Sequence, residues 1–403
     1  MHGPALTPGA EKRFDDYLDQ IGGLLRDKRQ RASFAIYAAG LLSDGERKSM
    51  EPMAARASGD PGLVSAMHHR LMHFTTTRAW EDVPVRRLAA RYAVDELERH
   101  EPITTWIIDD TGFLKQGSHS PGVQRQYTGS AGKRTNCQIG VSLVVANSYA
   151  EAPIDFRLYI PESWANDRAR CKAAHIPDDV GYSPKWRLGL DMIESAVEAE
   201  IPSGIVLADS AYGTVVEFRE RLDELGLTYA VGVKKNIIVR RVCAGGKLGQ
   251  PMSVEQLARR LKSRFRKTTW REGSKVSLHS RFARVRVVAG SGDDDQRVSQ
   301  WLLIEWPENE DAPTEYILST LPKTLSIKQL VRSTKNRWRV ERSYEDLKGQ
   351  LGLDHYEGRS FIGWHHHVTV ALACYAFLVA ERARSFSPST TWACQHDSLP
   401  HAA

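Results

Sequence analysis

Hydrophobic residues in the first hundred positions recur at the spacing of amphipathic helices. Phe14, Leu18, Ile21 and Leu25 lie three or four residues apart and so share one face of a helix. The segment 59–62 (GDPG) interrupts the pattern as a turn does. Further helices are predicted over 32–42, 63–74 and 85–98. We therefore expect an all-helical N-terminal domain.

From residue 104 the pattern changes to short apolar runs bounded by turn residues. Strands are predicted over 106–108 (WII, running into a turn at 109–112), 138–146 (QIGVSLVVA) and 154–160 (IDFRLYI). The run at 138–146 is almost continuously apolar, as expected of a buried central strand. The pattern continues with a helix over 185–200, a strand over 204–208, a helix over 215–225 and a strand over 229–233. Three strands, a helix, a strand, a helix and a strand follow each other in a ribonuclease H-like core.

A second β-rich region follows this core. Apolar or alternating runs predict strands at 276–278, 283–288, 301–304 and 315–318, with a basic helix at 254–264. Helices are predicted again over 326–336, 338–351 and 366–384. The chain is thus predicted to be an α/β protein with a helical N-terminal domain (1–100), a core in two parts (101–234 and 323–385), a β-rich insertion (235–322) and a flexible tail (386–403).

Charge and composition narrow the range of partners. The net charge is +6 with a pI near 9.0, which permits a polyanionic partner without requiring one. Basic residues cluster at 259–267 and 335–342, although solvated helix faces have the same composition. The N-terminus lacks the apolar segment of a signal peptide and no run approaches a membrane span, so we expect a cytoplasmic protein with no membrane contact. Five scattered cysteines argue against a disulfide framework or a zinc site.

Acidic residues follow two of the predicted core strands. Asp109 and Asp110 come after the first strand, and Asp209 comes after a later one. Catalytic groups gather at strand ends in α/β sheets, and two carboxylates there repel each other unless a cation lies between them. Mg²⁺, which prefers oxygen ligands, is the expected cation. The alternative is that each aspartate only forms a turn or caps a helix.

The helix predicted near residue 340 carries charges on a single stripe. Arg337, Glu341, Tyr344 and Lys348 are separated by four, three and four residues, which places them on one face. An acid flanked by two bases suits a metal-bound phosphate, with Glu341 on the metal and the two bases on neighbouring phosphates. A surface ladder of ion pairs is an equally good interpretation of the stripe alone.

Several separated motifs together resemble a known family. They are WIIDDTGFLKQG (106–117), QYTGSAGKRTNCQ (126–138), VLADSAYG (206–213) and LGLDHYEGR (351–359). The family pattern Tyr-x2-Arg-x3-Glu-x6-Lys is matched by Arg337, Glu341 and Lys348, whereas Thr334 stands in the tyrosine position. Over 106–384 the chain is similar to the DDE transposases of bacterial insertion sequences, in the group of insertion sequence family 701, which is related to family 4.

The resemblance implies an active site and a reaction. The family's Asp-x-Thr pattern selects Asp109, with Asp110 as the alternative, and Asp209 and Glu341 complete the triad. These three residues would hold two Mg²⁺ ions, for which Mn²⁺ substitutes, and would cut and rejoin DNA strands. Family members carry a β-rich insertion between the second aspartate and the glutamate, and the interval from 209 to 341 leaves room for one.

The resemblance also implies double-stranded DNA as the partner, both as the terminal inverted repeats of the element and as target DNA. The N-terminal helices would bind the element ends, and the protein would act as a homodimer on DNA. Further contacts to DNA are expected from Lys133, Arg134, Arg337, Tyr344 and Lys348. Two other functions fit the same residues: a domesticated DNA-binding regulator, and a ribonuclease H-like nuclease that cuts without strand transfer.

Overall fold

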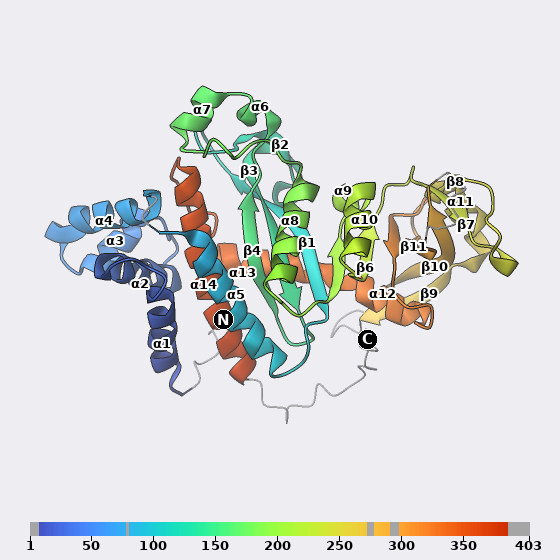
Figure 1. Ribbon diagram of the computed structural model, residues 1–403, viewed down its shortest axis with the longest axis horizontal. Helices are drawn as coiled ribbons and strands as arrows, with labels where there is room; N and C mark the ends of the chain where they lie inside the picture. Colours follow the sequence, from blue (N-terminus) through green and yellow to red (C-terminus); the bar gives the residue numbers. More distant parts are fainter. Residues whose placement is uncertain (1–7, 78–79, 272–277, 291–297, 386–403) are drawn as a thin grey trace.

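The computed structural model describes residues 8–77, 80–271, 278–290 and 298–385. Within them, one twelve-stranded sheet runs through the molecule, with helices packed along it (Figure 1). The predicted tail at 386–403, and residues 276–277 of a predicted strand, lie outside the described residues.

The sheet is mixed. Its strands are β1 (Thr105–Leu114), β2 (Gln124–Thr128), β3 (Lys133–Ala146), β4 (Glu151–Leu158), β5 (Ile205–Ala208), β6 (Tyr229–Gly232), β7 (Ile238–Arg241), β8 (Met252–Ser253), β9 (Arg266–Arg271), β10 (Leu278–Ala289), β11 (Gln300–Glu305) and β12 (Glu315–Ser319). They lie in the order β2-β3-β1-β5-β6-β12-β11-β10-β7-β8, while β4 pairs with β3 and β9 with β10.

One half of the sheet has the order expected of the predicted core. β1 pairs antiparallel with β3 and parallel with β5, and β5 pairs parallel with β6. β4 adds antiparallel to the other side of β3. The order β4-β3-β1-β5-β6 with these directions is compatible with a ribonuclease H-like fold. The prediction of a mixed α/β protein is therefore confirmed at that level.

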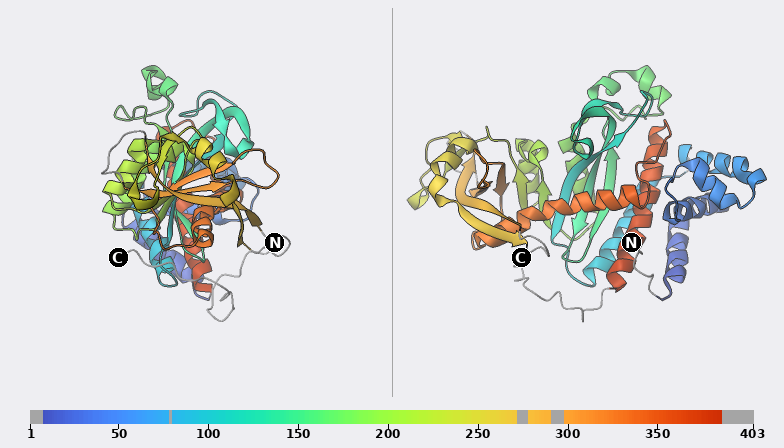
Figure 2. Two further views of the ribbon diagram at one scale, coloured as in Figure 1. Left: turned by 90° about the vertical axis from the view of Figure 1, so that its right-hand side faces the viewer. Right: turned by 180° about the vertical axis from the view of Figure 1, so that it is seen from behind.

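Helices cover both faces of the sheet and its end. They are α1 (Ala10–Gly22), α2 (Lys28–Leu42), α3 (Met50–Ser58), α4 (Val64–Thr76), α5 (Asp82–Glu98), α6 (Glu162–Ala165), α7 (Arg168–Ala173), α8 (Lys185–Glu198), α9 (Ser210–Gly213), α10 (Val216–Glu224), α11 (Val254–Arg260), α12 (Ile327–Lys335), α13 (Arg339–Gly349) and α14 (Phe361–Ser385). α8 lies in front of the sheet in Figure 1, and α13 crosses its back (Figure 2, right).

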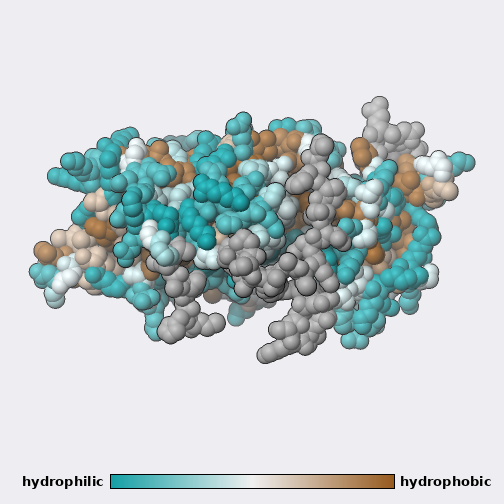
Figure 3. Space-filling view, turned by 90° about the horizontal axis from the view of Figure 1, so that it is seen from below, coloured by the Kyte–Doolittle hydropathy of each residue, from teal (hydrophilic) through white to brown (hydrophobic). Residues whose placement is uncertain are grey.

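The N-terminal helices share a core with the C-terminal helix. α5 and α14 lie side by side and both pack on β4, and buried residues from Tyr17 to Ala383 belong to one hydrophobic cluster. By length and composition, α14 is the one helix among the described residues that would suffice to span a bilayer, with a mean hydropathy of 1.2. However, 83% of that stretch is buried inside the protein, as in a core helix. The face seen from below is largely hydrophilic, with hydrophobic residues in small groups (Figure 3).

The β-rich segment from β7 to β12 continues the same sheet. β12 pairs antiparallel with β6 through Ile317–Ser319, and α11 covers a second hydrophobic cluster on β10 and β11. Lys335 at the end of α12 ties this segment to the C-terminal helices, since its Nζ lies 2.5 Å from Glu305 and 2.8 Å from Glu315. The two strands predicted at 276–278 and 283–288 form a single strand, β10, from Leu278 onward.

One prediction about the core strands was wrong, and one strand was not predicted. The turn predicted at 109–112 does not form, because β1 continues to Leu114 and pairs with β3 along its whole length. Cross-strand pairing has therefore overridden the turn propensity of Asp109-Asp110-Thr111-Gly112. β2 was not predicted, since its sequence QRQYT has little of the apolar alternation that marks a strand.

Candidate active site

Asp109 on β1 and Asp209, directly after the end of β5, lie at the same level of the sheet. Ile108 of β1 and Ala208 of β5 are register partners in a parallel pair, and each aspartate is the next residue along the chain. Adjacent strands are about 4.8 Å apart, so the two carboxylates are close neighbours. The pairing of β1 with β5 explains how residues one hundred positions apart come together.

The carboxylate of Asp109 is largely buried and has charged neighbours. Its Oδ2 lies 2.6 Å from Nη1 of Arg337, and its Oδ1 accepts a hydrogen bond of 2.8 Å from the backbone N–H of Asp110. Burial, helped by the negative charges of Asp110 and Asp209, raises the pKa of Asp109 to about 7. Arg337 and the backbone hydrogen bond from Asp110 oppose this rise. A carboxylate in this environment gains stability from any additional cation.

Asp209 caps a short helix. Its Oδ1 accepts a 2.7 Å hydrogen bond from the backbone N–H of Ala211 at the start of α9. The capping role that was the alternative interpretation of this residue is therefore present. It uses one carboxylate oxygen, while the structure gives Oδ2 no hydrogen bond within the described residues. The cap holds the carboxylate in place beside Asp109 and leaves an oxygen for another ligand.

The predicted charged stripe lies along Asn336–Trp338 (a single 3-10 turn) and α13, and it faces the core strands. Lys348 Nζ donates to Oγ1 of Thr111 and to the carbonyl of Gly112, both at 2.8 Å. The Tyr344 hydroxyl lies 2.7 Å from Oγ of Ser142. Tyr344, also predicted as a DNA contact, is only 8% exposed in the structure. Sequence analysis used Thr111 only as the threonine of the Asp-x-Thr pattern and did not identify it, Gly112 or Ser142 as partners of α13, because these contacts are long-range.

Glu341 lies on the same stripe but is exposed, with no hydrogen bond or ion pair to the rest of the described chain. Its negative charge affects the pKa of Arg337. Burial alone would lower the pKa of Arg337, but nearby carboxylates outweigh burial and raise it. These carboxylates belong to Asp109, Asp209, Glu315 and Glu341. One guanidinium thus interacts electrostatically with all three predicted triad members.

The three acids do not meet at ligand distances as they stand: within the described ranges no three His, Cys, Asp or Glu side chains are grouped closely enough to hold a metal. The donor chemistry nevertheless fits a hard divalent cation, since all three are carboxylates and the two aspartates are adjacent. Arg337 pairs with Asp109, and its positive charge also interacts with Asp209 and Glu341.

Asp110, the alternative first ligand, points to the other face of the sheet. Its Oδ2 lies 2.7 Å from Nζ of Lys185 in α8 and accepts a 3.3 Å hydrogen bond from the hydroxyl of Tyr212 in α9. Successive residues of a strand point to opposite faces, so Asp109 and Asp110 cannot share the side of α13. The geometry therefore favours Asp109 as the partner of Glu341, and gives Asp110 a structural bond to the helix that follows Asp209.

Residues 20–277 match the family described as DDE superfamily endonuclease. The chain belongs to this family. It is also 28% identical over 353 residues to the probable transposase for insertion sequence element IS701 of Microchaete diplosiphon, a match that covers 86% of this chain and 83% of that protein. The resemblance to insertion-sequence DDE transposases drawn from the motifs is thus confirmed. The family match includes both aspartates and ends before α13.

Members of the DDE superfamily act on nucleic acid, and the predicted basic contacts differ in their surroundings. Lys133 and Arg134 are exposed at the start of β3. Arg337 and Lys348 are partly buried and already bonded to β1. The exposed pair is available to a ligand as it stands, whereas the other two already take part in organising the acidic site.

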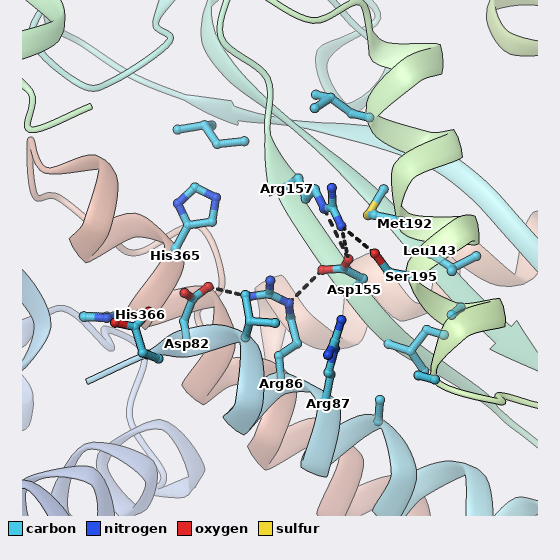
Figure 4. A pocket seen from close by; sticks show the side chains of 18 of the residues that line it. Asp82, Arg86, Arg87, Leu143, Asp155, Arg157, Met192, Ser195, His365 and His366 are labelled. Atoms are coloured by element: carbon cyan, nitrogen blue, oxygen red, sulfur yellow. Dashed lines mark hydrogen bonds and ion pairs between the residues drawn. The ribbon is translucent and has the colours of Figure 1, made fainter. Parts of the chain in front are cut away.

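A cavity of about 1030 Å³ lies on the opposite side of the sheet from Asp109, between α5, α8 and β4. It contains a chain of paired charges (Figure 4): Arg86 bridges Asp82 at 2.6 Å and Asp155 at 2.7 Å, and Asp155 also pairs with Arg157 at 3.3 Å. Each of these charges is already neutralised by a protein partner. The cavity therefore does not compete with the acidic site as the candidate active site of a DDE endonuclease.

Proposed function

We propose that the protein is a DNA transposase that binds the ends of an insertion sequence and catalyses metal-dependent strand cleavage and strand transfer. The observation that carries the proposal is the position of Arg337, bonded to Asp109 and within the electrostatic reach of Asp209 and Glu341. The charge of Arg337 thus acts on all three proposed triad members, beyond the ion pair that it makes with Asp109. Membership of the DDE superfamily endonucleases supports a catalytic role for these acids.

Asp109, Asp209 and Glu341 would together hold two Mg²⁺ ions, or Mn²⁺ in their place. When bound, such ions activate a water or a DNA 3′-hydroxyl and stabilise the leaving oxygen. Asp109 would be the central member of this ligand set, because it neighbours Asp209 across β1 and β5 and shares Arg337 with Glu341. Glu341 has no other partner within the described residues and is carried on α13, whose position on β1 is set by Lys348.

The remaining residues of the site bind and orient DNA. Arg337 would donate to phosphate oxygens of bound DNA, because a guanidinium pairs with phosphate as it does with carboxylate. Lys348 holds Thr111 and Gly112 and places its charge at the edge of the same site. Tyr344 is left out of the proposed DNA contacts because its hydroxyl is bonded inside the core.

The proposed partner is double-stranded DNA, as element ends and as target. Lys133 and Arg134 contribute phosphate contacts from the exposed start of β3, and the helices of residues 1–100 contribute recognition of the ends. We further propose a homodimer on DNA, since two element ends must be processed together, and a cytoplasmic reaction, since that is where bacterial DNA lies.

Incubation of purified protein with labelled DNA carrying the repeats that flank its gene, with Mg²⁺ or Mn²⁺, tests the proposal. Products joined to a second DNA molecule support transposition. Cleavage without joining indicates a nuclease, and retention on DNA without cleavage indicates a binding regulator. Either of the last two results overturns the proposed strand transfer.

A further inference from the structure

The hairpin formed by β2 and β3 exposes an aromatic ring next to basic side chains. Tyr127 is 63% exposed, and it is the register partner of the exposed Arg134. Side chains of directly opposed residues in an antiparallel pair lie on the same face, as does Arg125 two residues from Tyr127. Lys133, the exposed neighbour of Arg134 along β3, points to the other face. The outer side of the hairpin therefore combines one aromatic ring with a group of cations.

The cations of this hairpin lack counterions among the described residues. Residues 124–138 contain Arg125, Lys133 and Arg134 but no Asp or Glu. None of the three makes an ion pair or side-chain hydrogen bond with the described part of the protein, although many other arginines of the chain are paired. Unpaired positive charges held together on one small element repel each other unless an anion binds. The hairpin therefore has the electrostatic character of a polyanion contact.

The tip of the hairpin folds back onto β1, the strand that carries Asp109. Oγ of Ser130 lies 3.4 Å from the carbonyl of Gly112, the same carbonyl that accepts from Lys348 of α13. A Cβ at Gly112 would overlap Oγ1 of Thr128, so only glycine permits this approach. Gly112 is three residues from Asp109 along β1, a distance of about 10 Å, and its Cβ would point to the opposite face of the sheet. The tip of the hairpin is thus anchored on the same strand as Asp109, about 10 Å along it.

The base of the hairpin is held by hydrogen bonds to fixed elements. Nε1 of Trp164 in α6 donates to the carbonyl of Val123 at 2.8 Å. Nδ2 of Asn136 donates to the carbonyls of Lys115 and Gly117 at 2.8 and 2.9 Å. The hairpin is therefore a preorganised element, and a ligand bound to it does not need to order it first.

We propose that the outer face of this hairpin holds an unpaired stretch of DNA strand beside the scissile phosphate, with a base stacked on Tyr127 and phosphates bound by Arg125 and Arg134. This inference rests on the proposed DNA-cutting function. Cations alone would suit duplex DNA equally well. The exposed ring distinguishes the two ligands, because a base offers its π-face for stacking only when it is outside a duplex.

The test measures binding without cleavage, by fluorescence anisotropy of a labelled mixed-sequence single strand and of the matching duplex in EDTA. Y127A is expected to weaken single-strand binding about tenfold or more, the usual cost of losing one base–aromatic stack. Y127F keeps the ring and should bind as the wild type does. Y149A is the matched control, since Tyr149 is 42% exposed at the other end of β3.

A second variant addresses the phosphate contacts. R134Q should reduce the slope of log affinity against log salt by about 0.7 for the single strand, because one counterion fewer is released. The proposal is overturned if Y127A binds the single strand as tightly as wild type, or if its loss is the same on duplex DNA. If Y127A loses binding as expected but no metal-dependent cleavage occurs, the hairpin proposal stands and the proposed function fails. Metal-dependent cleavage by the wild type, together with unchanged single-strand binding by Y127A, refutes the hairpin proposal and leaves the proposed function standing.

Discussion

Nη1 of Arg337 lies 2.6 Å from Oδ2 of Asp109, although the two residues are 228 positions apart in the chain. This ion pair joins the central strand of the sheet to the turn that leads into α13. It sets the electrostatic state of the candidate active site, because Arg337 counteracts the rise that burial produces in the pKa of Asp109.

Metal affinity should depend on pH through Asp109. Its pKa is raised to about 7, so in the metal-free protein the carboxyl is increasingly protonated as pH falls through that value. A metal must then displace a proton, so Mn²⁺ affinity should fall by up to about tenfold per pH unit below 7 and level off above it. Calorimetric Mn²⁺ titrations on both sides of neutrality measure this. An affinity that is flat across the range contradicts the role given to Asp109.

Removal of Arg337 should move that dependence to higher pH. The guanidinium lowers the pKa of Asp109, so R337Q should raise this pKa further and shift the onset of full Mn²⁺ affinity upward. R342Q is the control, because Arg342 lies on α13 just after the turn that carries Arg337 but is 62% exposed and 3.8 Å from Glu151. Equal behaviour of the two variants in the same titration would show that the ion pair does not tune the site.

Loss of the carboxylate of either Asp209 or Glu341 should abolish cleavage. D209A and E341A are expected to reduce the cleavage rate by about three orders of magnitude or more, as for residues that act as one catalytic unit, while DNA affinity in EDTA is retained. E345A is the matched control, because Glu345 is an exposed acid on α13 that lies off the stripe. Near wild-type cleavage by D209A or E341A would remove that residue from the triad.

Substitution of Asp109 and of Asp110 should have different effects in the same cleavage assay. D109A should lose cleavage, whereas D110A should keep it and lose stability, by about 1–2 kcal/mol, since its bonds to Lys185 and Tyr212 disappear. Urea unfolding gives the stability and a gel assay gives the cleavage. A D110A protein that is stable but inactive would mean that the first metal ligand is Asp110.

Tyr344 should contribute to stability and not to DNA binding. Y344F leaves the buried Ser142 without its partner, which is expected to cost about 1 kcal/mol in the free energy of unfolding. The double variant Y344F/S142A removes both hydroxyls and should recover part of that loss. A Y344F protein of normal stability but weakened DNA affinity would restore Tyr344 as a DNA contact.

Much of the core was predictable because its signals are local. The apolar runs at 138–146 and 204–208 are long enough to identify buried strands, and they correspond to β3 and β5. The spacing of Arg337, Glu341 and Lys348 was enough to place them on one face of α13. Periodicity fixes such faces without reference to the rest of the chain.

Other features depended on contacts that no local pattern encodes. The extension of β1 through Gly112 follows from its pairing with β3, and the burial of Tyr344 follows from Ser142, 202 positions away. The stripe on α13 indicated a shared face but could not say which members would meet protein and which would meet solvent. β2 escaped prediction because its outward side is built from polar residues and an exposed Tyr127.

The hydrogen bonds between β6 and β12 have a mechanical consequence. Because Ala230–Gly232 pairs with Ile317–Ser319, the β-rich segment cannot swing away from the acidic residues without breaking backbone bonds in the middle of a continuous sheet. Clamping of a substrate by hinged rotation of that segment is thereby ruled out for the intact sheet. For the DNA binding proposed above, a rigid frame would favour sequences that deform readily to fit it.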